Sequence, residues 1–269
     1  MELDERSAPQ ADRDVAVRTA GIFTRRGRWT DLVDVVEATV NAAQRSRDES
    51  VEAHLLCQLA EFLWDMPERD ADRAIEVAEK GLALAERFSE RSLMSWALNT
   101  LALISLTQRR YTDAVGHLNK ALPLSSGYQH GRMEGVIEGN LSDAHAHLGN
   151  HQQALHHAGR ERMLRERAGD VEGIELACPQ HFALTCQLQG RPAEAVEIGN
   201  AALSQLNKRR VHPRGIGRLL DVMADLLVEL GDRQRAEACW EKALEVYEIF
   251  DLPRAAEIRA NLRGPYLAG

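Results

Sequence analysis

A small residue recurs about every forty positions along this chain, and this period is the strongest constraint on its fold. A second series of mostly small residues follows the first at a distance of about twelve positions. The first series is Ala20, Ala60, Ala102, Ser142, Ala183 and Ala224, and the second is Leu32, Ala74, Ala114, Ala154, Ala195 and Ala236. A fixed period of this size predicts a stack of six similar helical units rather than one compact core.

The composition fits such an array and excludes several classes of function. The chain has 269 residues and a formal net charge of −8, whereas nucleic-acid binding requires clustered Lys and Arg, so we expect no direct nucleic-acid contact. The acidic N-terminus does not resemble a signal peptide, and no apolar run reaches the ~18 residues of a membrane span. The four cysteines lack CxxC spacing, which favours reduced, buried thiols. We therefore predict a cytoplasmic protein with no membrane contact and no cofactor.

The fourth unit shows how each repeat is built. Leu141 and Ser142 lie on one face of a first helix, and Gly149 is placed to end that helix in the left-handed conformation. Asn150, followed by Gln153, resembles a capping box that begins a second helix. Glycines stand at the same point of three other units, five positions before the second marker: Gly27, Gly190 and Gly231. Each unit is therefore predicted to be a helical hairpin, and the second unit has a longer turn at 66–69.

These residues resemble the tetratricopeptide repeat. The match is best in the sixth unit, at Met223-Ala224, Leu227, Gly231, Ala236, Trp240 and Ala243-Leu244. The resemblance implies an all-α, right-handed α-solenoid of six helical hairpins with a C-terminal cap helix. We expect one superhelical domain over residues 13–264, a flexible N-terminus at 1–12 and a flexible tail at 265–269. Because the period exceeds the 34 residues of the ordinary repeat, the helices should be longer by about a turn.

Units four and five depart from the repeat pattern in the second helix. The usual large residue is only Ala158 in unit four and Gly199 in unit five, and Glu161 replaces a small residue. We therefore expect the packing between units four and five to differ from the average.

The two ends of the array are similar to the C-terminal sensor region of AfsR-type (SARP) and related signal-transduction ATPase regulators of high-GC bacteria. The similar segments are residues 26–33, 233–244 and 250–253. In that family the repeats follow a DNA-binding domain and a nucleotide-binding domain, and this chain contains neither a phosphate loop nor a basic recognition helix. The resemblance implies a regulatory module in transcription. Its expected partners are a protein or peptide, the adjacent nucleotide-binding domain of the same regulator, or a small-molecule effector.

Other functions are compatible with the same fold. The alternatives are a stand-alone adaptor or self-associating scaffold, with a homodimer as one form, and a receptor of the peptide-pheromone type. The sequence contains no motif of a serine hydrolase, zinc protease, dinucleotide-binding enzyme or P-loop ATPase. We therefore expect no enzymatic activity.

The tetratricopeptide resemblance also implies a binding groove, since the first helices of such a superhelix line its concave face. The residues that the repeat register exposes there are Glu61, Trp64, Trp96, Asn99, Leu103, Leu106, Asp143, Gln180, Leu184, Arg218 and Asp221. An apolar strip with scattered acids favours a partner helix, a basic peptide segment or an amphiphilic small molecule over a carboxylate clamp. The alternative is that Trp96, Leu103 and Leu106 pack against neighbouring helices.

Unit four is rich in histidine. The residues are His145, His147, His151, His156 and His157, with His130 upstream. Adjacent or turn-separated positions do not place two imidazoles on one helical face, so we expect solvated or capping roles and no metal site. Cys178 and His181 form a pair without a second pair of ligands, which also disfavours a metal.

Two further segments permit structural expectations. Pro179 leaves two interpretations open, since it either bends a long helix that starts near Val171 or lies in the first turn of a helix that starts at Cys178. The basic run at residues 208–210 is expected to be a solvated loop between units five and six.

Overall fold

The computed structural model describes residues 29–66, 70–126, 131–171, 173–206, 213–250 and 252–263, and at some positions inside these ranges it describes the backbone alone. Within these ranges the chain forms α-helices, one 3₁₀ turn and one π-helical turn, and no strand. The helices are α2 (Trp29–Ser46), α3 (Glu49–Asp65), α4 (Ala71–Arg87), α5 (Arg91–Thr107), α6 (Tyr111–Ala121), α7 (Arg132–His147), α8 (His151–Ala168), α9 (Cys178–Leu188), α10 (Pro192–Leu206), α11 (Pro213–Glu229), α12 (Arg233–Phe250) and α13 (Leu252–Arg263).

Several positions considered above lie outside the described residues. They are Ala20, Gly27, His130, the basic run at 208–210, and the terminal segments 1–12 and 265–269. The structure therefore describes the first unit by its second helix, α2, and the other five units as complete hairpins.

The predicted all-α solenoid is confirmed. Each first helix packs against the second helix of its own unit, so that the pairs are α3 with α4, α5 with α6, α7 with α8, α9 with α10, and α11 with α12. The cap helix predicted at the C-terminal end is α13, which packs on α12. Most of these helices contain 15 to 18 residues, and this length accounts for the long period.

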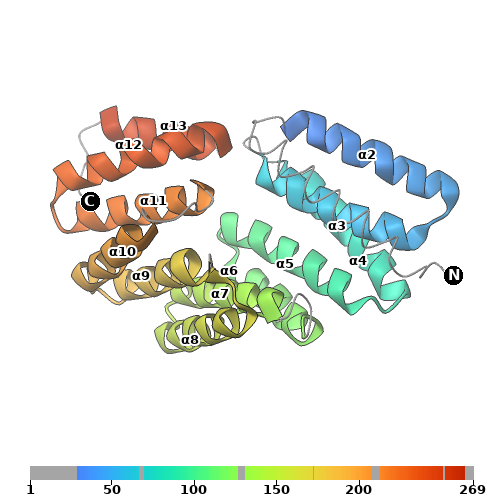
Figure 1. The fold of residues 1–269 in the computed structure, drawn as a ribbon, viewed down its shortest axis with the longest axis horizontal. Coiled ribbons are helices and arrows are strands. Elements are labelled where there is room, and N and C mark those ends of the chain that lie inside the picture. Colours follow the sequence, from blue (N-terminus) through green and yellow to red (C-terminus); the bar gives the residue numbers. More distant parts are fainter. Residues whose placement is uncertain are drawn as a thin grey trace, which may run out of the picture.

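The first helices also contact one another and form a continuous layer. Helix α3 packs on α5, α5 on α7, α7 on α9, and α9 on α11. Figure 1 shows the chain following an open arc from α2 through α7 and α8 to α12 and α13. We call the solvent-facing side of the layer formed by α3, α5, α7, α9 and α11 the inner face.

The recurring small residues lie at the helix crossings, as the period predicts. The described alanines of both series, from Ala60 to Ala236, have exposed fractions of 0%. In unit four the two series meet directly, because Ser142 Oγ donates a 2.9 Å hydrogen bond to the carbonyl oxygen of Ala154. Small side chains at these points let the helices approach closely, and larger ones would overpack the crossings.

The turns of the later hairpins contain the predicted glycine stops. Gly149, Gly190 and Gly231 have φ angles of 77°, 73° and 77°, in the left-handed region that favours glycine. The capping box expected at Asn150 is wrong, because its side chain makes no capping hydrogen bond. The amide Nδ2 of Asn150 lies 3.3 Å from Nδ1 of His145 instead.

The second hairpin has the long turn that its spacing predicts, since residues 66–70 separate α3 from α4. Both helices begin at a capping aspartate. Asp48 accepts a 3.1 Å hydrogen bond from the backbone N–H of Val51, and Asp70 accepts one of 3.1 Å from that of Arg73. These carboxylates satisfy backbone donors that the first turn of a helix leaves without intrahelical partners.

The backbone at Pro179 combines the two interpretations that the sequence left open. A π-helical segment at Gly173–Ala177 leads directly into α9, which begins at Cys178. The helical path therefore starts before the proline, and the missing N–H of Pro179 falls in the first turn of α9. The wider π turn accommodates a residue that cannot donate the regular backbone hydrogen bond.

Gly199 stands where the repeat pattern has a large residue, and Met223 of α11 fills the space. A Cβ atom at position 199 would overlap the sulfur of Met223. We therefore expect Gly199→Ala to lower the free energy of unfolding by about 1–3 kcal/mol, as measured by urea denaturation followed by circular dichroism. In a Met223→Val background, Gly199→Ala should lower the free energy of unfolding by a smaller amount. Equal losses of unfolding free energy in the two backgrounds would contradict this packing.

Candidate functional site

Two polar pairs join the first helices of successive units across the inner face. Trp96 Nε1 on α5 donates a 3.0 Å hydrogen bond to Glu61 Oε2 on α3. Asn140 Nδ2 on α7 donates a 2.9 Å hydrogen bond to Asn99 Oδ1 on α5. Asn99 is only 5% exposed, so the expectation that it lies open in the groove is wrong, because α5 packs on α7 at this point. These bonds fix neighbouring first helices relative to each other and place tryptophan, carboxylate and amide groups along one face.

The predicted apolar strip is present but half-buried. Leu103, Leu106 and Leu184 all have intermediate exposure. Leu103 packs against the apolar core of the first hairpins and Leu106 against the core between the third and fourth. The Trp96 ring lies edge-on to His54, with ring centroids 5.5 Å apart. These side chains pack against their neighbours and still leave part of their surface to solvent, so each of the two interpretations holds in part.

The structure corrects the expected exposure of Trp64. Its exposed fraction is 5%, and it belongs to the apolar core shared by α2, α3 and α4, because burial of a large aromatic ring gives a large gain in free energy. Asp143 is half-buried, with Oδ1 3.3 Å from Nε2 of His147. The structure describes the backbone of Gln180 but not its side chain.

The cap helix covers the C-terminal end of the inner face. Arg254 of α13 binds Asp221 of α11 through Nε and Nη2, at 2.8 and 2.7 Å, and Tyr247 donates a 3.3 Å hydrogen bond to the same carboxylate. The expectation that Asp221 is exposed for binding is therefore wrong, because an arginine from the same chain covers it. Burial and the nearby charge of Asp221 raise the pKa of Asp225 to about 6. Arg218 is half-buried.

Unit four contains a buried carboxylate that orders two of its histidines. Glu138 on α7 is 1% exposed, and its two oxygens lie 2.6 Å from His157 Nδ1 and 2.5 Å from Arg160 Nε on α8. The ring of His145 stacks on that of His157 with centroids 5.3 Å apart. Burial alone would raise the pKa of Glu138, but the hydrogen bonds from His157 and Arg160 lower it. The solvated roles expected for His145 and His157 are therefore wrong.

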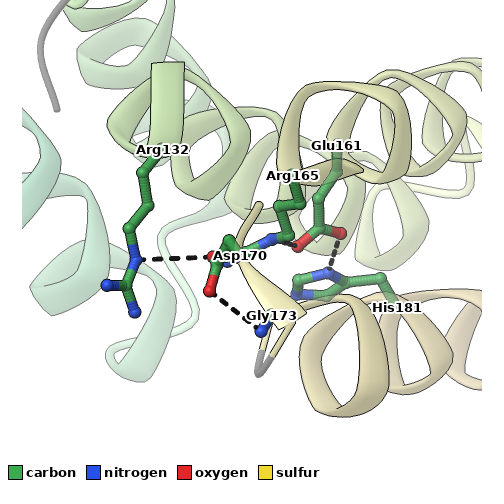
Figure 2. Close-up of polar contacts among 6 residues, drawn as sticks. All are labelled: Arg132, Glu161, Arg165, Asp170, Gly173 and His181. Atoms are coloured by element: carbon green, nitrogen blue, oxygen red, sulfur yellow. Dashed lines mark hydrogen bonds and ion pairs between the residues drawn. The ribbon is translucent and has the colours of Figure 1, made fainter. Parts of the chain in front are cut away.

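A second buried carboxylate joins units four and five, and Figure 2 shows its partners. Glu161 on α8 is fully buried and binds Arg165 Nε at 2.7 Å and His181 Nδ1 on α9 at 2.6 Å. Arg165 continues to Asp170 with a distance of 2.5 Å, and Arg132 on α7 approaches Asp170 at 3.4 Å from the exposed rim. We call the three buried residues Glu161, Arg165 and Asp170, together with the half-buried His181, the polar joint. The expectation that packing differs between units four and five is confirmed.

Glycines make room for the polar joint. A Cβ at Gly139 on α7 would lie 2.6 Å from His181 and 2.7 Å from Glu161, and a Cβ at Gly173 would overlap Arg165. The backbone N–H of Gly173 also donates a 3.2 Å hydrogen bond to Asp170 Oδ1. The close approach of α7 to α9 therefore depends on glycine at position 139.

Sequence reasoning found some of these residues and missed others. The departure at Glu161 was a usable signal, whereas Arg165, Asp170 and Arg254 were missed because a single charged residue on a helix is ordinarily solvated. Asn140 was missed because the repeat register places Gly139, not Asn140, at the position equivalent to Asn99.

The described residues offer no metal site and no membrane span. Among them, no group of three or more His, Cys, Asp or Glu side chains could hold a metal ion. In the same part of the chain, every helix is too short or too polar to cross a bilayer. Cys57 and Cys186 are buried free thiols, whereas Cys239 is only half-buried.

A stack of helical hairpins with small residues buried at every crossing and a continuous layer of first helices defines a tetratricopeptide-type α-solenoid. Arrays of this class present extended binding surfaces to other molecules. The chain therefore has the architecture of a protein-binding scaffold.

Comparison with known proteins agrees with this class. No family model matches the chain. The chain is 25% identical over 236 residues to the regulatory protein AfsR of Streptomyces coelicolor, an alignment that covers 71% of this chain and 23% of AfsR. The chain thus spans less than a quarter of the length of that relative. The resemblance to AfsR-type regulators is confirmed over this region.

A solved structure of low sequence identity shares the fold. A Rap protein complexed with Competence and Sporulation Factor superposes with a TM-score of 0.64 at 14% identity, covering 90% of this chain and 71% of the Rap chain. A thermophilic TPR protein from Thermus thermophilus gives a TM-score of 0.49 at 18% identity, covering 78% of this chain and 96% of that protein. The Rap comparison supports the solenoid architecture.

Proposed function

We propose that this chain is the partner-binding module of a bacterial transcriptional regulator and that it binds a protein or peptide segment on its inner face. The observation that carries the proposal is the row of half-buried side chains on successive first helices, in which Trp96 is tied to Glu61 and Asn140 is tied to the buried Asn99. The similarity to AfsR over 236 residues supports a regulatory setting.

The chemistry of the face favours an amphipathic partner with amide or basic groups. Leu103, Leu106 and Leu184 offer partly exposed apolar surface, and Asn140 and Asp143 on α7 offer polar groups beside it. A short apolar contact flanked by hydrogen-bonding groups is the usual anatomy of such an interface. The expected partner is the nucleotide-binding domain of an AfsR-like regulator from the same source.

Binding can be tested by calorimetry with that purified domain. We expect the double variant Asn140→Ala with Asp143→Ala to weaken binding about tenfold or more, because truncated side chains at the centre of an interface cost upwards of 1 kcal/mol each. The matched control is Glu76→Ala on α4, whose i,i+4 partner Lys80 is exposed, and its affinity and melting temperature should equal those of the wild type.

Two outcomes would count against the proposal. Equal weakening in the control would show that binding does not use the inner face. Tight self-association of the chain with no heat of binding to the domain would instead favour the adaptor or scaffold alternative.

A further inference from the structure

We propose that the polar joint is a charge-controlled hinge, at which the N-terminal half of the solenoid (residues 29–168) and the C-terminal half (residues 173–263) rotate relative to each other. Such a hinge changes the curvature of the inner face, whichever partner binds there.

Among the side chains that the structure describes, the apolar clusters on the two sides of this point are separate. The cluster that joins the third and fourth hairpins extends along the chain as far as Ala144, and the cluster of the C-terminal half begins at Ala183. Among the described side chains, no apolar cluster contains residues from both halves. Each of the other described junctions between units is spanned by an apolar cluster, so rotation there would expose that apolar surface.

The described side chains at this junction form buried ion pairs. Glu161 on α8 reaches across to His181 on α9 at 2.6 Å, and Arg165 ties Asp170, just after the end of α8, to the same carboxylate. An ion pair of this kind is favourable only while its geometry is retained, since each charge loses its hydration when buried. The arrangement in which these ion pairs are formed, which we call the closed state, is therefore stable, whereas arrangements in which the halves are partly rotated and the ion pairs are broken are not.

The backbone beside the joint is suited to rotation. Gly169 ends α8 in the left-handed conformation with φ of 63°, and the π-helical turn at Gly173–Ala177 precedes Pro179. Hinges are formed by a few residues at the ends of helices that absorb changes in φ and ψ, and π turns are frequent at functional positions. The segment from 169 to 179 has both features between the two halves.

The charges around His181 make the closed state sensitive to protons. It faces Glu161 and Arg165 from α8 and Asp143 from α7. With His181 protonated, the joint contains two positive and two negative groups, and Arg132 adds a positive charge at the rim. Loss of the proton leaves one positive and two negative groups among these four residues. The exposed Arg132 offsets the excess only from the rim, so the buried part of the joint carries an excess negative charge, which is costly.

The direction of the pH effect follows from the pKa of His181. Burial alone would lower this pKa, but the charge and hydrogen bond of Glu161 raise it above the ordinary value. A raised pKa in the folded chain means that the stabilisation is fully present below the unfolded value of about 6.5. It is lost as the pH rises through the raised pKa, so alkaline conditions open the hinge.

Hydrogen–deuterium exchange tests the hinge. The measured exchange rates are corrected for the pH dependence of intrinsic amide exchange, and the amides of α5 in the same molecule serve as the internal reference. In the wild type we expect protection of the amides at 161–170 and in α9 to fall at least tenfold between pH 6 and pH 9, while α11 remains protected. X-ray scattering should show an altered distance distribution over the same range. His181→Gln should lose protection already at pH 6 and show no further pH change.

A matched control comes from unit four. Glu138 has the same kinds of partner, one histidine and one arginine, but both belong to its own hairpin, so Glu138→Gln should leave exchange in α9 and its pH dependence unchanged. If His181→Gln does not fold, Glu161→Gln removes the same ion pair with a side chain of equal size. The hinge is ruled out if α9 and α11 lose protection together, or if either joint variant keeps the wild-type pH dependence.

Discussion

Glu161→Ala is expected to lower the free energy of unfolding by about 3–5 kcal/mol, because removing one partner of a buried ion pair leaves the remaining charge unpaired. Glu161 is fully buried and accepts from both Arg165 and His181. The substitution removes the ion-pair partner of His181 and leaves Arg165 with Asp170 as its remaining partner. Urea denaturation followed by circular dichroism at pH 6.5 measures the loss.

The control for this prediction lies on the same helix. Glu166 forms an i,i+4 ion pair with Arg162 at 3.0 Å, but both side chains are more than half exposed. Exposed helical pairs of this geometry contribute about 0.3–0.5 kcal/mol, so Glu166→Ala should hardly change the unfolding curve. Similar losses for the two glutamates would mean that Glu161 contributes through helix propensity rather than through the joint.

The sequence period was sufficient for the fold because packing in this architecture is local and repetitive. Each crossing requires a small side chain, so the spacing of Ala60, Ala102 and their equivalents is enough to locate the helices along the chain. The repeat pattern of the second helix located Glu161 as an exception. A buried carboxylate in place of a small residue was predicted to alter the packing between units four and five, and it does.

The partners of these residues were beyond sequence reasoning, since they depend on how one hairpin is rotated against the next. Arg165 lies one turn from Glu161, but its burial follows from the approach of α9 and α7. Asp221 was correctly placed on a first helix and wrongly expected to be exposed, because the cap helix brings Arg254 onto it. The positions along each helix were thus predictable, whereas the side-chain pairs between units were not, and even the pair of Asn99 with Asn140 joins two positions that are offset by one residue in the repeat.

Trp240→Ala should destabilise the C-terminal half by about 3–5 kcal/mol, the usual cost of truncating a buried tryptophan. Trp240 on α12 is fully buried in the cluster that also contains Leu219, Met223 and Ile258. Because repeats contact only their neighbours, this loss should remain within α9 to α13. We therefore expect urea unfolding to separate into two steps, with the C-terminal half unfolding first.

The separation of urea unfolding into two steps depends on the separate apolar clusters on the two sides of the polar joint. A variant in the cluster of the other half is therefore the control for this prediction. Leu63, 1% exposed in the core of the first hairpins, belongs to the other half, and Leu63→Ala should reverse the order of unfolding at a cost of about 2–5 kcal/mol. Exchange measured at intermediate urea assigns each step to its helices. A single transition that shifts as a whole in both variants would show that the joint couples the two halves as strongly as an apolar core, because a weak junction cannot transmit the loss of one core to the other.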